Sequence, residues 1–316
     1  MSTIIFLLKN MIPFTIPLTV VALGGMFSER SGVVNIALEG IMIFSASVGI
    51  FFIHFMQDSI TGQLLLFIAL LISMTAGIVF SLLHAYASVN LKANQVISGT
   101  ALNLFAASFH VFLARMIFGV QGVPFINQFR IAEIPYLSKI PFIGEIFFTS
   151  VYMTTVVGLL ILVGSYIVLF KTRFGLRLRA CGEHPQAADS VGINVYKMRY
   201  AGVMISGALA GIGGLILVLP SFTEFAGDVA GYGFLALAVL IFGQWNPKKV
   251  FMAALFFGLM KTISNASGLS LLASLHINSY FYKILPYVAT MAVLTITSKK
   301  SAAPKAAGEP YDQGKR

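Results

Sequence analysis

Long apolar stretches alternate with short polar connections along most of the chain. A helix that crosses the hydrocarbon core of a membrane needs about 20 mostly apolar residues. Nine stretches approach that length, at residues 11–27, 40–56, 64–86, 96–117, 149–170, 200–219, 231–246, 249–266 and 281–297. This pattern predicts an all-α, polytopic integral membrane protein with eight to ten transmembrane helices.

Two segments near the N-terminus need separate interpretation. Residues 28–39 are too polar and too few to span a membrane, so they predict a re-entrant segment or an interfacial turn. Lys9 interrupts the first apolar stretch, and no small-residue cleavage site follows it. We therefore interpret that stretch as a retained first span rather than a signal peptide.

Composition supports the membrane assignment. Hydrophobic residues make up 58% of the chain and charged residues only 10%, whereas a soluble domain has about 25% charged residues. The net charge of +10 would suggest a nucleic-acid partner in a soluble protein. Here the basic residues lie between apolar stretches, so they indicate topology and no nucleic-acid partner is expected.

One internal loop, residues 171–199, is strongly basic. Its basic residues are Lys171, Arg173, Arg177, Arg179, Lys197 and Arg199, against the acidic Glu183 and Asp189. Lys248 and Lys249 mark a second basic connection. Cytoplasmic loops are enriched in Lys and Arg, so both connections are predicted to be cytoplasmic.

The same rule divides the chain into regions. We expect a permease domain over residues 1–297, with an outer loop at 118–148, followed by a disordered cytoplasmic tail at 298–316. The outer loop is either a spacer or a docking surface for an external partner. Nine spans would place the N-terminus outside, and one further span would place it inside.

Small residues are spaced for close helix packing. Gly207 and Gly211 are four positions apart in one predicted span. Small residues at this spacing let helix backbones approach each other in lipid. We expect packing within the subunit, with a subunit interface as the alternative.

The sequence lacks the motifs of the common enzyme classes. It has no P-loop and no H-E-x-x-H or Cys/His cluster, so no bound ATP, metal or other cofactor is expected. Ser98 and Ser206 follow isoleucine, without the first glycine of a rhomboid-type serine protease motif. We expect no catalytic residue, and we expect the single cysteine, Cys181, to be a small loop residue.

Charged residues within the apolar stretches are few, and Lys261 and Glu39 are the main ones. Intramembrane charges usually mark a proton or ion path. Glu39 is expected near the cytoplasmic end of its span. So few charges argue against an ion-coupled secondary transporter of a small polar solute, which needs groups to bind the driving ion. Such a transporter is kept as the alternative function, and a membrane-embedded hydrolase is a third.

The basic loop contains a short predicted helix. Pro185 suits the first helical turn, and Gly192 can end the helix in a left-handed cap. The helix would present small apolar groups on a basic platform, namely Ala187, Ala188, Val191 and Ile193. Such a rigid projection could receive the movement of a soluble motor, or it could rest on anionic lipid.

Four segments resemble the permease subunits of ABC importers. They are residues 22–40, 92–103, 175–193 and 231–247, which read ALGGMFSERSGVVNIALEG, KANQVISGTALN, GLRLRACGEHPQAADSVGI and GYGFLALAVLIFGQWNP. They are most similar to the ribose, nucleoside and branched-chain amino acid type, and within it to the shorter of two paired nucleoside or simple-sugar permeases. His184 and Ala37 depart from the family, which often has Asn and Gly there.

The resemblance implies a transport subunit of the bacterial inner membrane, not an enzyme, in which a partner hydrolyses ATP. The implied partners are a cytoplasmic ABC ATPase, a second permease in a homodimer or heterodimer, an extracytoplasmic substrate-binding protein and the lipid bilayer. The residues implied to contact the ATPase are Gly182, Glu183, Pro185, Ala187, Ala188, Gly192 and Ile193.

A path for nucleosides or simple sugars needs hydrogen-bonding groups in a mostly apolar lining. The candidates are Asn35, Glu39, Asn94, Gln95, Ser98 and Asn103. The alternative role for these side chains is helix capping or hydrogen bonding between helices.

Overall fold

A computed structural model describes residues 2–126, 129–133, 135, 138, 140, 144, 149–265, 284, 288, 291, 295 and 302–313. The helices of the described part are α1 (Ser2–Arg30), α2 (Leu38–Met56), α3 (Gly62–Val89), α4 (Gln95–Phe118), α6 (Met153–Lys171), α7 (Arg173–Glu183), α8 (Pro185–Ser190), α9 (Val195–Ser221), α10 (Tyr232–Phe242) and α11 (Pro247–Asn265). The strands are β1 (Val123–Pro124), β2 (Arg130–Glu133), β3 (Thr149–Tyr152) and β4 (Glu224–Phe225).

Within the described residues, six helices are long and apolar enough to cross a membrane: Ile5–Arg30 of α1, then α2, α3, α4, α6 and α9. They match the first six predicted stretches. The stretch at 231–246 contains the 11-residue helix α10, whose length of about 16 Å is too short for a complete crossing. Helix α11 occupies the stretch at 249–266, and the stretch at 281–297 lies outside the described residues except at four positions.

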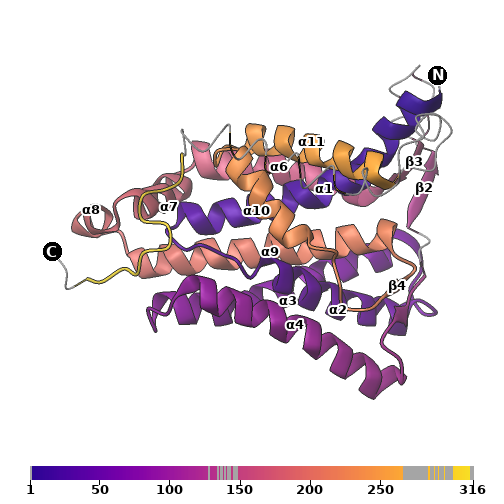
Figure 1. The fold of residues 1–316 in the computed structure, drawn as a ribbon, viewed down its shortest axis with the longest axis horizontal. Coiled ribbons are helices and arrows are strands. Elements are labelled where there is room, and N and C mark those ends of the chain that lie inside the picture. The colour runs from indigo at the N-terminus through magenta and orange to yellow at the C-terminus, as the bar shows by residue number, and fades with distance from the viewer. Residues whose placement is uncertain are drawn as a thin grey trace.

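The long helices run between two distinct ends of the molecule (Figure 1). One end carries α7, α8 and the C-terminal segment, and the other carries the N-terminus and the strands. We name the first end cytoplasmic after the prediction for the basic loop that contains α7 and α8. The N-terminus lies at the opposite end, so this prediction places it on the outer side.

Helix α9 forms the centre of the bundle and packs against α1, α2 and α3. Glycines make this packing close. A Cβ atom at Gly77 of α3 would collide with the carbonyl oxygen of Gly207, and one at Gly211 would collide with the carbonyl oxygen of Ser73. The predicted role of Gly207 and Gly211 in packing within the subunit is confirmed.

Two short antiparallel pairs join connections at the outer end. Strand β1 pairs with β4 through Val123 and Phe225, and β2 pairs with β3 through Arg130 and Tyr152. The described part of the predicted outer loop is thus paired with the α9–α10 connection through β4 and with the segment before α6 through β3.

The C-terminal segment differs from the predicted disordered tail. Residues 302–313 lie along the cytoplasmic end (Figure 1). Pro304, Ala306 and Tyr311 are buried there, because they pack against the helices of the basic loop and their neighbours. This packing could not be predicted from the sequence, since the segment has the Ala, Lys, Gly and Pro composition of a solvated end.

Candidate functional site

The connection between α1 and α2, residues 31–37, reaches into the membrane interior. The Asn35 side-chain nitrogen donates to the Ser206 hydroxyl at 2.9 Å. Ser206 lies about three helical turns into α9 from its cytoplasmic end. Residues 28–30 end α1 and residues 38 and 39 begin α2, so the segment predicted as re-entrant or as an interfacial turn is the connection between two helices, with Asn35 beside the middle of α9.

Polar side chains of α3 and α4 hold this connection. Gln95 accepts a hydrogen bond from the Val34 amide at 2.7 Å. The Nε2 atom of His84 lies 3.0 Å from the Val34 carbonyl oxygen, and its Nδ1 atom lies 2.6 Å from the Ser98 hydroxyl. A carbonyl can only accept, so Nε2 carries the proton and Nδ1 accepts from Ser98.

Asn103 bonds the same segment twice. Its side-chain nitrogen donates to the Ile36 carbonyl at 3.0 Å, and its side-chain oxygen accepts from the Gly40 amide at 2.7 Å. Asn94 has a separate role as the N-cap of α4, where it accepts from the amides of Val96 and Ile97.

Glu39 lies at the N-terminus of the short helix α10. Its carboxylate accepts from the Gly231 amide at 2.9 Å and from the Gly233 amide at 2.5 Å. The amides at a helix start have no partner within the helix, and the helix dipole favours an anion there. Glu39 therefore joins the start of α2 to the start of α10. It lies in the first turn of α2, at the end of this span that follows the cytoplasmic end of α1, as predicted.

The six predicted substrate-path residues thus have structural partners. Five of them meet around residues 34–40, namely Asn35, Glu39, Gln95, Ser98 and Asn103. Their contacts match the alternative of capping and bonding between helices. Sequence reasoning missed His84 and the Gly231 and Gly233 amides, because no spacing rule relates groups this far apart in the chain.

The second part of the site is the loop at the cytoplasmic end, where α7 leads into α8. Pro185 is the first residue of α8, and Gly192 has a φ of 82°. The amides of Gly192 and Ile193 donate back to the carbonyls of Asp189 and Ala188. The predicted helix start and its left-handed glycine cap are confirmed.

The residues predicted to contact the ATPase differ in their exposure. Ala187 and Gly192 are exposed, and Glu183 and Ile193 are half-buried. Gly182, Pro185 and Ala188 are buried within the chain, so they cannot face a partner directly. The exposed surface, which we call the α8 face, consists of His184, Gln186, Ala187, Ser190 and Val191, and Val191 is 74% exposed.

Glu183 is partly exposed and forms an ion pair that links three elements. Its carboxylate lies 3.4 Å from the Arg30 guanidinium at the end of α1. Arg30 also donates to the Trp245 carbonyl at 3.1 Å, and the Trp245 indole nitrogen donates to Glu29 at 2.6 Å. This Glu183–Arg30–Trp245 link joins the loop of α8 to the turn between α10 and α11.

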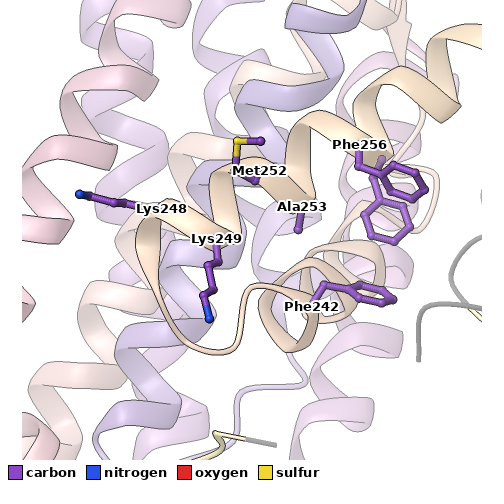
Figure 2. Close-up of a pocket in the computed structure, with 7 residues that line it drawn as sticks. Phe242, Lys248, Lys249, Met252, Ala253 and Phe256 are labelled. Atoms are coloured by element: carbon purple, nitrogen blue, oxygen red, sulfur yellow. The ribbon is translucent and has the colours of Figure 1, made fainter. Parts of the chain in front are cut away.

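A cavity of about 440 Å³ lies between α10 and α11 at the cytoplasmic end. Figure 2 shows the rings of Phe242 and Phe256 and the side chains of Met252 and Ala253 around it, with Lys248 and Lys249 at one side. Its mostly apolar lining does not suit a polar solute. The described residues include no group of three His, Cys, Asp or Glu side chains that could hold a metal ion.

Comparison with known proteins identifies the family. Residues 7–294 match the profile of the permease component of branched-chain amino acid transport systems. The chain belongs to this family. It is the membrane-spanning permease subunit of an ABC importer, a transport subunit rather than an enzyme, and a multi-pass protein of the bacterial inner membrane.

Its curated relatives match over nearly the whole chain. The chain is 43% identical to the guanosine ABC transporter permease NupQ of Bacillus subtilis, and the match covers 99% of each protein. It is 40% identical to the nucleoside ABC transporter permease NupC of Lactococcus lactis, again over 99% of each. A further nucleoside ABC transporter permease of that organism, NupB, is 24% identical over 78% of this chain and 69% of NupB. No solved structure matches the chain.

Proposed function

We propose that this permease carries nucleosides into the cell, with a second permease chain beside it, and that the α8 face contacts the ATPase. The nucleoside assignment is supported by the names of NupQ and NupC. The observation that carries the coupling role is an exposed helix at the cytoplasmic end, connected through Glu183, Arg30 and Trp245 to α10.

The contacts suggest how movement of α8 reaches the membrane interior. A displacement of α8 moves Glu183 at the end of α7, and Glu183 holds Arg30 and through it the Trp245 turn. That turn precedes α11 and follows α10, whose other end is bonded to Glu39. A packed element shifts as a rigid body, so the start of α2 follows the movement.

The second permease is proposed to be a different chain. NupB and NupC occur together in Lactococcus lactis, and this chain is far more similar to NupC than to NupB. A NupB-type chain is therefore the expected partner. The outer end, where β1 pairs with β4, would face the substrate-binding protein.

The α8 face is tested with the reconstituted transporter in liposomes. Val191→Asp places a charge on the most exposed apolar side chain of this face. We expect at least a tenfold loss of ATPase co-purification and of ATP-driven uptake. Val120→Asp is the matched control for ATPase binding, because Val120 is exposed at the outer end, and it should retain normal ATPase co-purification. Normal co-purification of Val191→Asp would contradict the proposal.

Substrate class is tested by uptake of labelled guanosine in competition with other nucleosides, ribose and glucose. Nucleosides should compete, whereas the free sugars should not. Competition by the sugars alone would make the chain a sugar permease. Uptake without ATP, driven by a proton or sodium gradient and lost on replacement of Lys261 or Glu39, would instead support the ion-coupled alternative.

A further inference from the structure

Residues 302–313, which we call the strap, cross the cytoplasmic end and bond to three separate connections. The Ala302 amide donates to Gln244 in the turn between α10 and α11, at 3.0 Å. The Ala306 amide donates to the Gly182 carbonyl at the end of α7, at 2.9 Å. The Gly308 amide donates to the Gly32 carbonyl between α1 and α2, at 3.2 Å.

Tyr311 of the strap packs on the buried side of helix α8. It is 4% exposed and packs in one apolar cluster with Cys181 of α7, Ala188 of α8 and Val195 of α9. Its hydroxyl is hydrogen-bonded to the carboxylate of Asp189 on α8. Burial, together with this hydrogen bond, raises the pKa of Tyr311 to about 12, so the phenol stays neutral at physiological pH.

The strap also provides partners for basic residues of the same end. Arg199 is 1% exposed, and its guanidinium donates to the Glu309 carbonyl at 2.9 Å. The guanidinium fills the space beside Gly32, where a Cβ atom would lie 2.9 Å from Nη2. Lys92, between α3 and α4, lies 3.1 Å from the Asp312 carboxylate.

Helix α8 needs this support because it is short. Six residues are too few for a helix to be stable alone, so its position depends on tertiary contacts. Its buried side rests on Tyr311 through Ala188. The strap further bonds the α1–α2 connection and the α10–α11 turn, the same two regions that the Glu183–Arg30–Trp245 link reaches.

We infer that the strap is part of the coupling machinery, and that Tyr311 is a positioning residue that holds α8 at the angle needed to transmit the ATPase stroke. The inference rests on the proposed contact between the α8 face and the ATPase. Removal of the ring leaves the α8 face intact for docking but lets α8 move independently of the spans. ATP would then be hydrolysed without substrate movement.

The test compares Tyr311→Ala, Tyr311→Phe and Lys305→Ala in the assembled transporter. Tyr311→Ala should retain ATPase co-purification within twofold, lose at least tenfold in nucleoside uptake, and lose stimulation of ATP hydrolysis by the loaded binding protein. Tyr311→Phe keeps the ring and should rescue uptake to within threefold. Lys305 is an exposed strap residue, and Lys305→Ala should match the unmodified transporter.

The rate of Cys181 labelling measures whether the packing around Tyr311 is intact, independently of transport. It is the only cysteine of the chain and is buried in the same cluster. Burial raises its pKa to about 11, so a maleimide at pH 7.5 should label it slowly in the unmodified chain. Labelling should become at least tenfold faster in Tyr311→Ala, but not in Tyr311→Phe.

The outcomes separate the two proposals. Normal uptake with a protected Cys181 in Tyr311→Ala would overturn the strap inference. So would a parallel loss of ATPase binding and uptake, because the strap would then serve assembly alone. If Tyr311→Ala fails to accumulate, Tyr311→Leu replaces it and the same criteria apply. Failure of the α8 contact itself is seen only in Val191→Asp, which leaves Tyr311 in place.

Discussion

At the residue scale, Gly77 and Gly207 determine how closely α3 and α9 pack. A Cβ atom at Gly207 would collide with the Ser81 hydroxyl and with the Gly77 carbonyl oxygen. The four-residue spacing of Gly207 and Gly211 was enough to predict close packing, but their partners could not be predicted. Gly77 and Ser73 belong to a helix whose facing side is not marked by a strong apolar stripe.

Gly207→Ala should therefore destabilise the protein. The added methyl group forces two backbones apart, which typically costs about 1–3 kcal/mol. Gly164→Ala is the matched control, because no atom lies within 4 Å of a Cβ at Gly164. It should be neutral or slightly stabilising, since alanine favours a helix. Thermal survival in detergent, measured by size-exclusion chromatography, should fall for the first variant only. Equal melting of the two variants would contradict the packing role.

At the element scale, α10 ends before the stretch that was predicted as its span. The sequence suggested one span over 231–246, but the helix ends at Phe242, and Gln244 and Trp245 adopt positive φ values of 49° and 51°. The sequence marks this turn with polar residues, Gln244 and Asn246, followed by Lys248 and Lys249, so the predicted span was drawn four residues too far. Hydropathy cannot detect that the partners of Glu39 are helix amides rather than a basic side chain.

Glu39→Gln tests the junction of α2 and α10. One amide oxygen can still accept, but the side-chain NH₂ would face a backbone donor and leave it without a partner. A buried donor without a partner costs about 1–3 kcal/mol. We expect a lower melting temperature and at least fivefold lower uptake. Glu133→Gln, an exposed residue of β2, should change neither property. A stable variant with normal uptake would show that the junction is dispensable.

For α8, the sequence predicts the start and the cap of the helix but not its exposed side. Pro185 and Gly192 predicted where the helix starts and how it is capped, since both effects are local. Which side of the helix faces outward depends on contacts between distant parts of the chain, since Ala188 is buried in one cluster with Cys181, Val195 and Tyr311. The predicted projection therefore contained the buried Ala188 and omitted the exposed Gln186 and Ser190.

At the scale of the whole molecule, different kinds of contact join the connections at the two ends. Short strand pairs join the outer connections, whereas a charged link and the strap join the cytoplasmic ones. The distribution of basic residues predicts which end is cytoplasmic, because it reflects the membrane orientation of a chain. The N-terminal side could be assigned only after the end of α1 was found beside Glu183.

This orientation predicts opposite accessibility of two introduced cysteines. In a Cys181→Ala background, Asn10→Cys lies at the outer end and Lys305→Cys in the strap. A membrane-impermeant maleimide added to intact right-side-out vesicles should label the first and not the second. Permeabilised vesicles should be labelled at both positions. Labelling of the strap cysteine in intact vesicles would reverse the assigned orientation.

Because the strap supports α8 but is synthesised after it, the order of synthesis affects when α8 becomes functional. Residues 302–313 follow α7, α8 and α9 in the chain, so they leave the ribosome after all three. The coupling helix thus enters the cytoplasm before Tyr311 is available to support it. A prematurely terminated permease would insert its spans and display α8, yet could not translate nucleotide turnover into movement. On this inference, synthesis of the strap is required before the subunit can couple ATP hydrolysis to transport.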